Sequence, residues 1–180
     1  MTKTMLSQSE ILAQWDHILS APKDLGKVDM LVIRRESDAR EIRQEVFFSA
    51  QYGMEGDRWA RKAARDPNRD SQISLMGTRI LSLVAEGDQE RMAQAGDNIV
   101  LDLDLTEANL RAGDRLQIGE VILEVTPEAH NGCKKFAQRF GTDALKVINA
   151  MDKRSLHLRG IFTRVLSDGL IRVGDTVQKR

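Results

Sequence analysis

Short apolar segments bounded by turn residues constrain the fold of this chain more than any other feature of its sequence. In residues 99–105, one Ile and three Leu alternate with Val, Asp and Asp, and this period of two is typical of a strand with one face on a core. Gly119-Glu120 lies between two strand-like runs in residues 114–126, and Asp168-Gly169 lies between residues 160–166 and 170–177. Glycine at such places favours a tight turn, so both predict hairpins.

The strand-like segments number roughly seven or eight, and most follow one another directly. Residues 7–20, 78–85 and 142–151 have helical spacing, with a further helical turn at 134–140. Because these helices do not alternate regularly with the strands, we expect a mainly β fold with α additions, in which a closed, largely antiparallel β-barrel carries peripheral helices. The strand-like segments are residues 28–34, 40–48, 72–76, 99–105, 114–126, 160–166 and 170–177.

The first 26 residues differ from the rest of the chain. Ser7 and Glu10 have the spacing of a capping box, and an apolar stripe predicts one amphipathic helix over residues 7–20. A chain of 180 residues suits one ordinary domain with a hydrophobic core. We therefore predict an N-terminal helix and linker at residues 1–26 and a single β-barrel domain at residues 27–180.

Charge and hydropathy argue against several classes of partner. Lys and Arg number 27, and Asp and Glu also number 27, so the chain has no net charge that would attract nucleic acid. The sequence has no run of about 18 apolar residues and no signal-peptide core, so we expect no membrane association and a cytoplasmic protein. Neither a dinucleotide fingerprint nor a Walker loop occurs.

Cys133 is the only cysteine, and this excludes both an internal disulfide and a zinc site with several thiolates. Gly132 precedes it and permits a tight bend and a close approach of the backbone. If a helix begins at Lys134, its N-terminus and the charges of Lys134 and Lys135 stabilise the thiolate. A nucleophile, a sulfur carrier and a soft-metal ligand all need that thiolate.

Two other groups of polar residues are candidates with open alternatives. His130 and His157 are each either a base for Cys133 or a polar surface histidine. The long loop after residue 51 is either an anion-binding segment or a solvated surface loop, because acidic residues balance part of its charge. Its basic residues are Arg58, Arg61, Lys62, Arg65 and Arg69.

Several short motifs in a fixed order make the chain resemble the MOSC domain, the module found at the C-terminus of molybdenum cofactor sulfurases and as small bacterial proteins. The resemblance covers residues 28–177, and the ordered set is more specific than any one piece. The motifs are Glu55-Gly56-Asp57-Arg58, Ile73-Ser74-Leu75, Gly96-Asp97-Asn98-Ile99, residues 110–119, Gly132-Cys133, residues 159–169 and Val173-Gly174-Asp175.

The resemblance implies a functionally central cysteine, which Cys133 matches, and sulfur or molybdenum-cofactor chemistry. Cys133 would carry sulfur as a persulfide, as a sulfurtransferase-like carrier does, or would coordinate molybdenum in the pterin cofactor. The cofactor has a phosphate that basic residues could hold. The candidate cofactor-binding residues are Arg58, Asn98, Lys134, Lys135 and Arg164.

The implied partners follow from the same resemblance. The pyridoxal-phosphate domain of the large sulfurases has no counterpart here, so we expect a separate cysteine desulfurase as sulfur donor and a metal-sulfur or molybdoenzyme acceptor. One alternative is a molybdenum-cofactor-dependent oxidoreductase that reduces N-hydroxylated substrates. Another is a non-catalytic barrel that binds a small molecule or a partner.

Two departures from the family pattern bear on the site. Gly96-Asp97-Asn98 stands where the family usually has Gly-Glu-Asn, and Gly132 stands where proline commonly precedes the cysteine. Glycine has more backbone freedom than proline, so the second change predicts a more flexible loop around Cys133.

Overall fold

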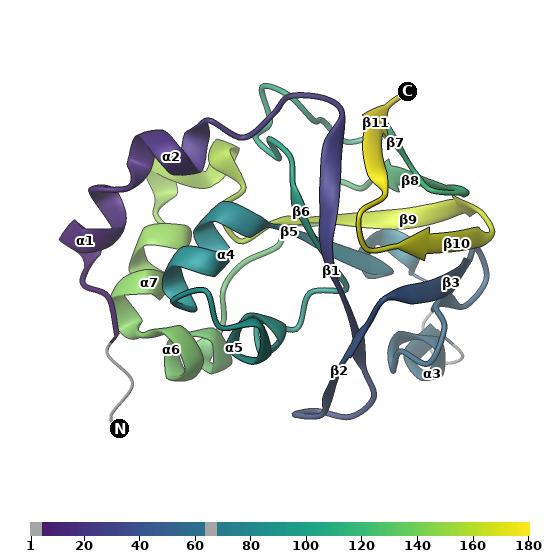
Figure 1. Ribbon diagram of the computed structural model, residues 1–180, viewed down its shortest axis with the longest axis horizontal. Coiled ribbons are helices and arrows are strands. Elements are labelled where there is room, and N and C mark those ends of the chain that lie inside the picture. The colour runs from purple at the N-terminus through teal and green to yellow at the C-terminus, as the bar shows by residue number, and fades with distance from the viewer. Residues whose placement is uncertain (1–4, 64–67) are drawn as a thin grey trace.

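The strands form a closed barrel, and most helices lie on one side of it (Figure 1). The structure is a computed structural model that describes residues 5–63 and 68–180. Seven strands follow in the order β11-β7-β8-β9-β5-β6-β1, and a further pairing of β11 with β1 closes the barrel. In the described chain every barrel pair is antiparallel except β5 with β6, which confirms the predicted architecture. The barrel strands are β1 (Gly26–Arg34), β5 (Ile73–Gly77), β6 (Ile99–Asp102), β7 (Arg115–Ile118), β8 (Val121–Val125), β9 (Ile161–Ser167) and β11 (Thr176–Lys179).

A smaller sheet shares the barrel core and corrects one strand prediction. Its order is β10 (Gly169–Arg172), β3 (Glu45–Ser49) and β4 (Gly53–Met54). The single strand predicted over residues 40–48 is wrong, because β2 (Arg40–Arg43) pairs with β1 and the chain then pairs with β10 from Glu45 onward. As a result Val46 and Phe48 face the barrel core, whereas Ile42 packs against the helices.

The hairpin predicted at Asp168-Gly169 is also wrong, although the one at Gly119-Glu120 is confirmed by the pairing of β7 with β8. β9 pairs with β8 and β5, whereas β10 pairs with β3. Gly169 does not have the positive φ that a tight hairpin turn needs, and Asp168 Oδ1 accepts a hydrogen bond of 2.7 Å from the backbone N–H of Ala50. The chain therefore crosses from one sheet to the other at this point.

The N-terminal segment forms two short helices where one was expected. The capping box of Ser7 and Glu10 is present, but the helix ends at Leu12 and a second begins at Trp15. Ile11 and Ile18 are both buried against the helical side of the barrel. The division into residues 1–26 and 27–180 stays a prediction. The helices are α1 (Gln8–Leu12), α2 (Trp15–Leu19), α3 (Trp59–Ala63), α4 (Thr78–Val84), α5 (Gln89–Ala93), α6 (Lys134–Phe140), α7 (Thr142–Ile148), and the 3-10 turns η1 (Arg69–Ser71) and η2 (Met151–Leu156).

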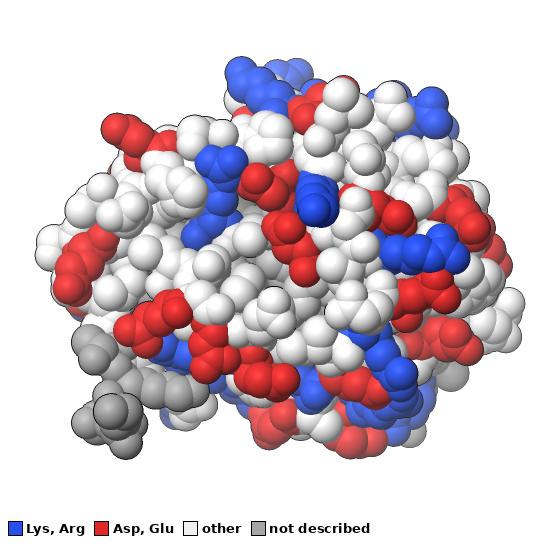
Figure 2. Space-filling model, in the orientation of Figure 1, with Lys and Arg blue, Asp and Glu red and all other residues white. Residues whose placement is uncertain are grey.

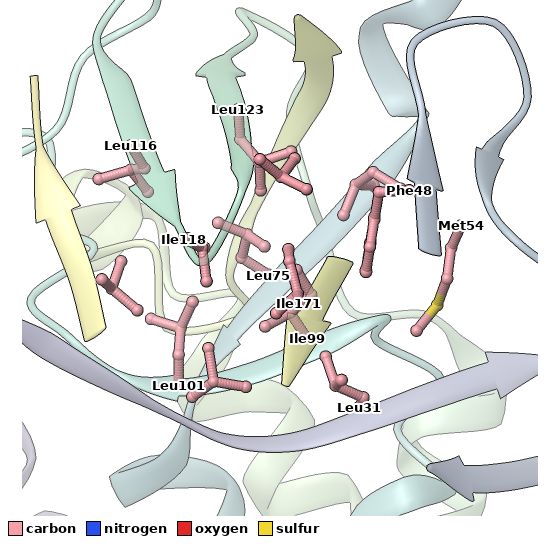
Figure 3. Close-up of a cluster of buried hydrophobic side chains, with 14 of the residues drawn as sticks. Leu31, Phe48, Met54, Leu75, Ile99, Leu101, Leu116, Ile118, Leu123 and Ile171 are labelled. Carbon is pink, nitrogen blue, oxygen red and sulfur yellow. The ribbon is translucent and has the colours of Figure 1, made fainter. Parts of the chain in front are cut away.

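Two hydrophobic clusters hold these layers together. The first fills the barrel, where side chains such as Leu75, Ile99 and Leu123 point toward one another from different strands (Figure 3). The second lies between the barrel and the helices. The strand β6 serves both, because Leu101 faces the first cluster and Val100 the second.

Charges of both signs are interspersed over the face of the molecule seen in Figure 2, as the balanced composition predicts. Within residues 5–63 and 68–180, no helix has both the length and the apolar character needed to cross a membrane.

Candidate functional site

Cys133 lies at the start of a helix that belongs to the helical side of the barrel. β8 ends at Val125, residues 126–132 follow, and Cys133 is the N-cap of α6. Its backbone is extended, with φ −116° and ψ 176°, and its thiol is exposed. A reactant can therefore reach the sulfur from solvent.

The surroundings of Cys133 lower the pKa of its thiol from the ordinary value of 9.0. Partial burial raises this pKa, but the backbone N–H groups of Phe136 and Lys135 and the charges of Arg159 and Arg139 together lower it by more. Sγ accepts no capping hydrogen bond, so the N–H groups act on it as dipoles. Arg159 and Arg139, rather than the adjacent lysines, make the main charge contributions.

Gly132 is held in place, contrary to the flexible loop expected from the sequence. Its φ does not lie in the left-handed region. The side chain of Asn149 accepts a hydrogen bond of 2.8 Å from Gly132 N–H and donates one of 2.9 Å to Gly132 O. A Cβ at this position would lie 2.7 Å from Leu145 Cδ1 and 2.8 Å from Ile148 Cδ1. A side chain at this position would require Leu145 and Ile148 to shift, because α7 packs closely against the loop.

Arginines from four parts of the chain converge on residues 94–96, just after α5. Arg139, Arg159 and Arg34 donate hydrogen bonds of 2.6, 3.2 and 3.4 Å to the carbonyls of residues 94, 95 and 96, respectively. Arg40 packs on residue 96, where an added Cβ would lie 3.1 Å from Arg40 Nη2. We call these four residues the arginine cluster. Arg139 and Arg159 both lower the pKa of the Cys133 thiol, so these two members of the arginine cluster lie near it.

The arginine cluster carries positive charge that nearby acids only partly neutralise. The pKa of Arg40 falls to about 10, because its guanidinium is partly buried and lies near Arg139, Arg58 and Arg34. Arg40 donates to the carbonyls of residues 36 and 39 at 3.2 and 3.1 Å, and its Nε is buried without a partner in the described chain. A site of this kind favours binding of an anion. Arg58, a predicted site residue, belongs to this region.

A buried carboxylate fixes one member of the arginine cluster. Asp57 accepts hydrogen bonds from Arg34 Nε at 2.8 Å, Arg34 Nη2 at 2.9 Å and Asn98 Nδ2 at 3.1 Å, and from the backbone N–H groups of Arg34 and Trp59. Burial raises the pKa of Asp57, but the contacts with Arg34 lower it by more. Asn98 Oδ1 is occupied by Ser74, so Asn98 positions Asp57. Its direct contact with a cofactor stays a prediction.

A second buried carboxylate holds Arg159. Asp97 Oδ2 accepts a hydrogen bond of 2.7 Å from Arg159, while Asp97 Oδ1 lies 3.7 Å from His130 Nε2. Burial raises the pKa of Asp97 and lowers that of His130 well below its ordinary value, so the imidazole is neutral. The ring of His130 stacks on Phe162 at a centroid distance of 4.2 Å. Among the described contacts His130 forms no hydrogen bond with Cys133.

The other candidate base lies elsewhere. His157 Nδ1 is 2.7 Å from the carbonyl oxygen of Leu105, and the described part of the chain shows no bond between His157 and Cys133. A cavity of about 510 Å³ is lined by His130, His157 and Arg159 but not by Cys133. In the described ranges no group of three or more His, Cys, Asp or Glu side chains could hold a metal ion.

The two predicted lysines differ in their contacts. Lys134 is exposed and forms no ion pair among the residues described, whereas Lys135 Nζ lies 2.6 Å from Ser37 Oγ and 3.3 Å from Asp38 Oδ1. Asp38 also accepts a hydrogen bond of 2.8 Å from Arg139. This exposed carboxylate therefore ties the β1–β2 connection to α6 beside the thiol.

Arg164 is the predicted site residue that the structure places apart from the others. It bonds Glu124 at 2.7 Å and Asp70 at 3.2 Å, and among the described contacts neither of these acids touches Cys133 or the arginine cluster. Its role as a cofactor contact stays a prediction without geometric support.

The basic residues of the loop after residue 51 also differ in their surroundings. Arg61 pairs with Glu36 and Arg69 donates to Val165 O, while Arg65 lies outside the described residues. Arg58, at the start of the loop, lies near Arg40 of the arginine cluster.

The sequence did not point to Arg34, Arg40, Arg139 or Arg159. Arg34 ends an apolar strand, and Arg159 begins a motif of the MOSC resemblance, so both positions carried a weak signal. Arg40 and Arg139 carried none, because their meeting depends on tertiary structure.

Comparisons with known proteins agree with the fold and indicate a family. The MOSC domain family model matches residues 49–178. No curated protein is similar enough in sequence to match. The YuaD protein from Bacillus subtilis has a TM-score of 0.62 and 20% identity over 86% of this chain and 94% of its own. YiiM from Escherichia coli has a TM-score of 0.56 and 18% identity over 86% and 69%. These two likenesses concern the fold, whereas the family match spans most of the chain, including the cysteine loop. The chain belongs to the MOSC domain family.

Proposed function

We propose that the protein carries sulfur on Cys133 and serves metal-sulfur or molybdenum-cofactor chemistry. The observation that supports this most is an exposed thiol with a lowered pKa beside a partly unneutralised arginine cluster. A persulfide carrier needs a thiolate that large reactants can approach. It needs no general base on the thiol, and neither histidine is bonded to Cys133 in the described chain.

The sulfur step is an exchange between two sulfur atoms. The Cys133 thiolate attacks the outer sulfur of a persulfide on the donor, for which we propose a separate cysteine desulfurase. The donor's S–S bond breaks, its inner sulfur leaves as a thiolate, and a new S–S bond forms on Cys133. Transfer to a nucleophilic acceptor reverses these roles, and the lowered pKa makes Cys133 a good leaving group.

Arg58 and members of the arginine cluster fit the phosphate of the molybdenum cofactor. Arg40 Nε is a buried donor without a partner in the described part of the chain, and Arg58 is exposed beside it. We propose that Arg40, Arg58 and Arg139 hold the phosphate. When bound, the cofactor would supply a redox-active molybdenum ion. Arg34 and Arg159 orient the site, since Asp57 and Asp97 hold them.

The arginine cluster also favours a second candidate, an oxidoreductase that retains the cofactor and reduces N-hydroxylated substrates. Cys133 would then be the protein ligand of molybdenum. The two candidates share the anion site and differ in whether the cofactor stays bound.

Mass spectrometry separates these functions. After incubation with a cysteine desulfurase and cysteine, the carrier gains the mass of one sulfur atom at Cys133, and Cys133→Ser does not. If wild-type protein gains no sulfur, the carrier function is wrong. Co-purified molybdenum near one atom per chain, lost in Cys133→Ala, would instead support the oxidoreductase.

A further inference from the structure

The side chain of Asn149 contacts the backbone of Gly132, which lies 17 positions earlier in the chain. Asn149 is the C-cap of α7, and its backbone N–H bonds the carbonyl of Leu145. Its amide oxygen and nitrogen bond both polar groups of the Gly132 backbone, at 2.8 and 2.9 Å. One side chain therefore fixes the peptide planes on both sides of the residue that precedes Cys133.

The absence of a Cβ at Gly132 is part of the same arrangement. An alanine there would meet Leu145 and Ile148 of α7 at less than 3 Å. Asn149 can reach the Gly132 backbone because nothing separates the loop from α7. The helix and the cysteine loop are therefore expected to move as one unit.

The pair offers a physical reason for the missing proline. A proline at position 132 would have a restricted φ, but it would have no backbone N–H to donate to Asn149. Glycine leaves φ free and costs backbone entropy unless tertiary contacts hold it. The two hydrogen bonds of Asn149 supply those contacts.

We propose that Asn149 is a positioning residue for Cys133, holding Gly132 so that the thiol stays at the first turn of α6. The functional importance of this positioning rests on the proposed function of Cys133. The position of the thiol itself can be measured without any sulfur transfer. Loss of the Asn149 amide frees the Gly132 peptide planes and lets Sγ leave the N–H groups of Lys135 and Phe136.

The single cysteine makes the test direct, because a nitroxide label reacts at Cys133 alone. Electron paramagnetic resonance then reports the mobility of residue 133, and iodoacetamide measures the thiol's reactivity in unlabelled protein. The variants are Asn149→Leu, which keeps size and removes both hydrogen bonds, and Asn149→Asp, which keeps the acceptor for Gly132 N–H. Asn131→Leu is the matched control, since Asn131 lies in the same loop, is exposed and forms no hydrogen bond within the described chain.

We expect a mobile spectral component in Asn149→Leu, a smaller one in Asn149→Asp, and the wild-type spectrum in Asn131→Leu. Alkylation at pH 7 should slow about threefold in Asn149→Leu, the size of a typical contribution from helix-terminal dipoles. Wild-type spectra and rates in the folded Asn149 variants would overturn the inference. If Asn149→Leu does not fold, Asn149→Asp decides alone. A wild-type protein that accepts no sulfur refutes the carrier function and leaves this result standing.

Discussion

Arg34 and Asp57 form a bidentate ion pair, with Nε to Oδ2 at 2.8 Å and Nη2 to Oδ1 at 2.9 Å. The Asp57 side chain is fully buried, and the Arg34 side chain is 13% exposed. The pair joins the end of β1 to the segment before α3, and through Arg34 it anchors the arginine cluster.

Asp57→Asn should destabilise the fold by about 3–5 kcal/mol, because it leaves the buried Arg34 charge without its partner. Urea unfolding followed by circular dichroism measures this. Glu36→Gln is the control, since the Arg61–Glu36 pair is exposed and its loss should cost about 1 kcal/mol or less. Equal effects of the two substitutions would contradict the role given to Asp57.

The same pair predicts a pH dependence. The pKa of Asp57 in the fold lies below its ordinary value of 3.8, so its contribution is present above that value and is lost as pH falls through the folded pKa. The stability difference between wild type and Asp57→Asn should therefore be constant near neutral pH and shrink below pH about 4. A stability difference that grows as the pH falls would mean that the fold raises the pKa of Asp57.

Cys133 should react as a thiolate at lower pH than an ordinary cysteine. The pH profile of iodoacetamide alkylation should have its midpoint below 9.0. Arg139→Gln should raise that midpoint and slow the reaction at pH 7 about threefold, since one cation near the thiol is removed. Arg164→Gln, far from these contacts, should leave the profile unchanged.

An anion should stabilise the protein through the arginine cluster. Sulfate should raise the Tm of wild type above that in chloride of equal ionic strength, and Arg40→Gln should lose at least half of this rise. Arg164→Gln is again the control. A rise that survives in Arg40→Gln would mean that sulfate acts by general exclusion from the surface.

Gly160 tests the packing of the site against the barrel. Its φ is +96°, and a Cβ would lie 1.9 Å from the carbonyl oxygen of Leu75. Gly160→Ala should destabilise the fold by about 3 kcal/mol or more, because the backbone at residue 160 or at Leu75 of β5 must shift. Gly77→Ala, where nothing lies within 4 Å, should change the stability by about 1 kcal/mol or less.

Local pattern predicted much of the fold. The helix α6 is found where a helical turn was considered over residues 134–140, and the hairpin of β7 and β8 follows from periodicity and turn residues. The split of residues 40–48 does not, because the apolar period continues while the partner strand changes from β1 to β10. Which sheet a strand joins is a property of its neighbours in space.

The thiol of the candidate site was evident from the sequence, whereas the charged residues around it were not. Cys133 stands out as a single thiol before a helix, whereas Arg34 and Arg159 lie 125 positions apart in the sequence and meet only at residues 94–96. The adjacent lysines were the better candidates by proximity in sequence. In the structure, the charges of Arg159 and Arg139 lower the pKa of the thiol instead.

The chain has no second thiol, and this determines the fate of an oxidised Cys133. In proteins with a resolving cysteine, an internal thiolate attacks a persulfide, closes a disulfide and releases the outer sulfur as hydrosulfide. Cys133 has no such partner within its own chain. In the proposed carrier, a sulfur atom on Cys133 would therefore meet no internal thiol, and its release would need a thiol or acceptor on another molecule.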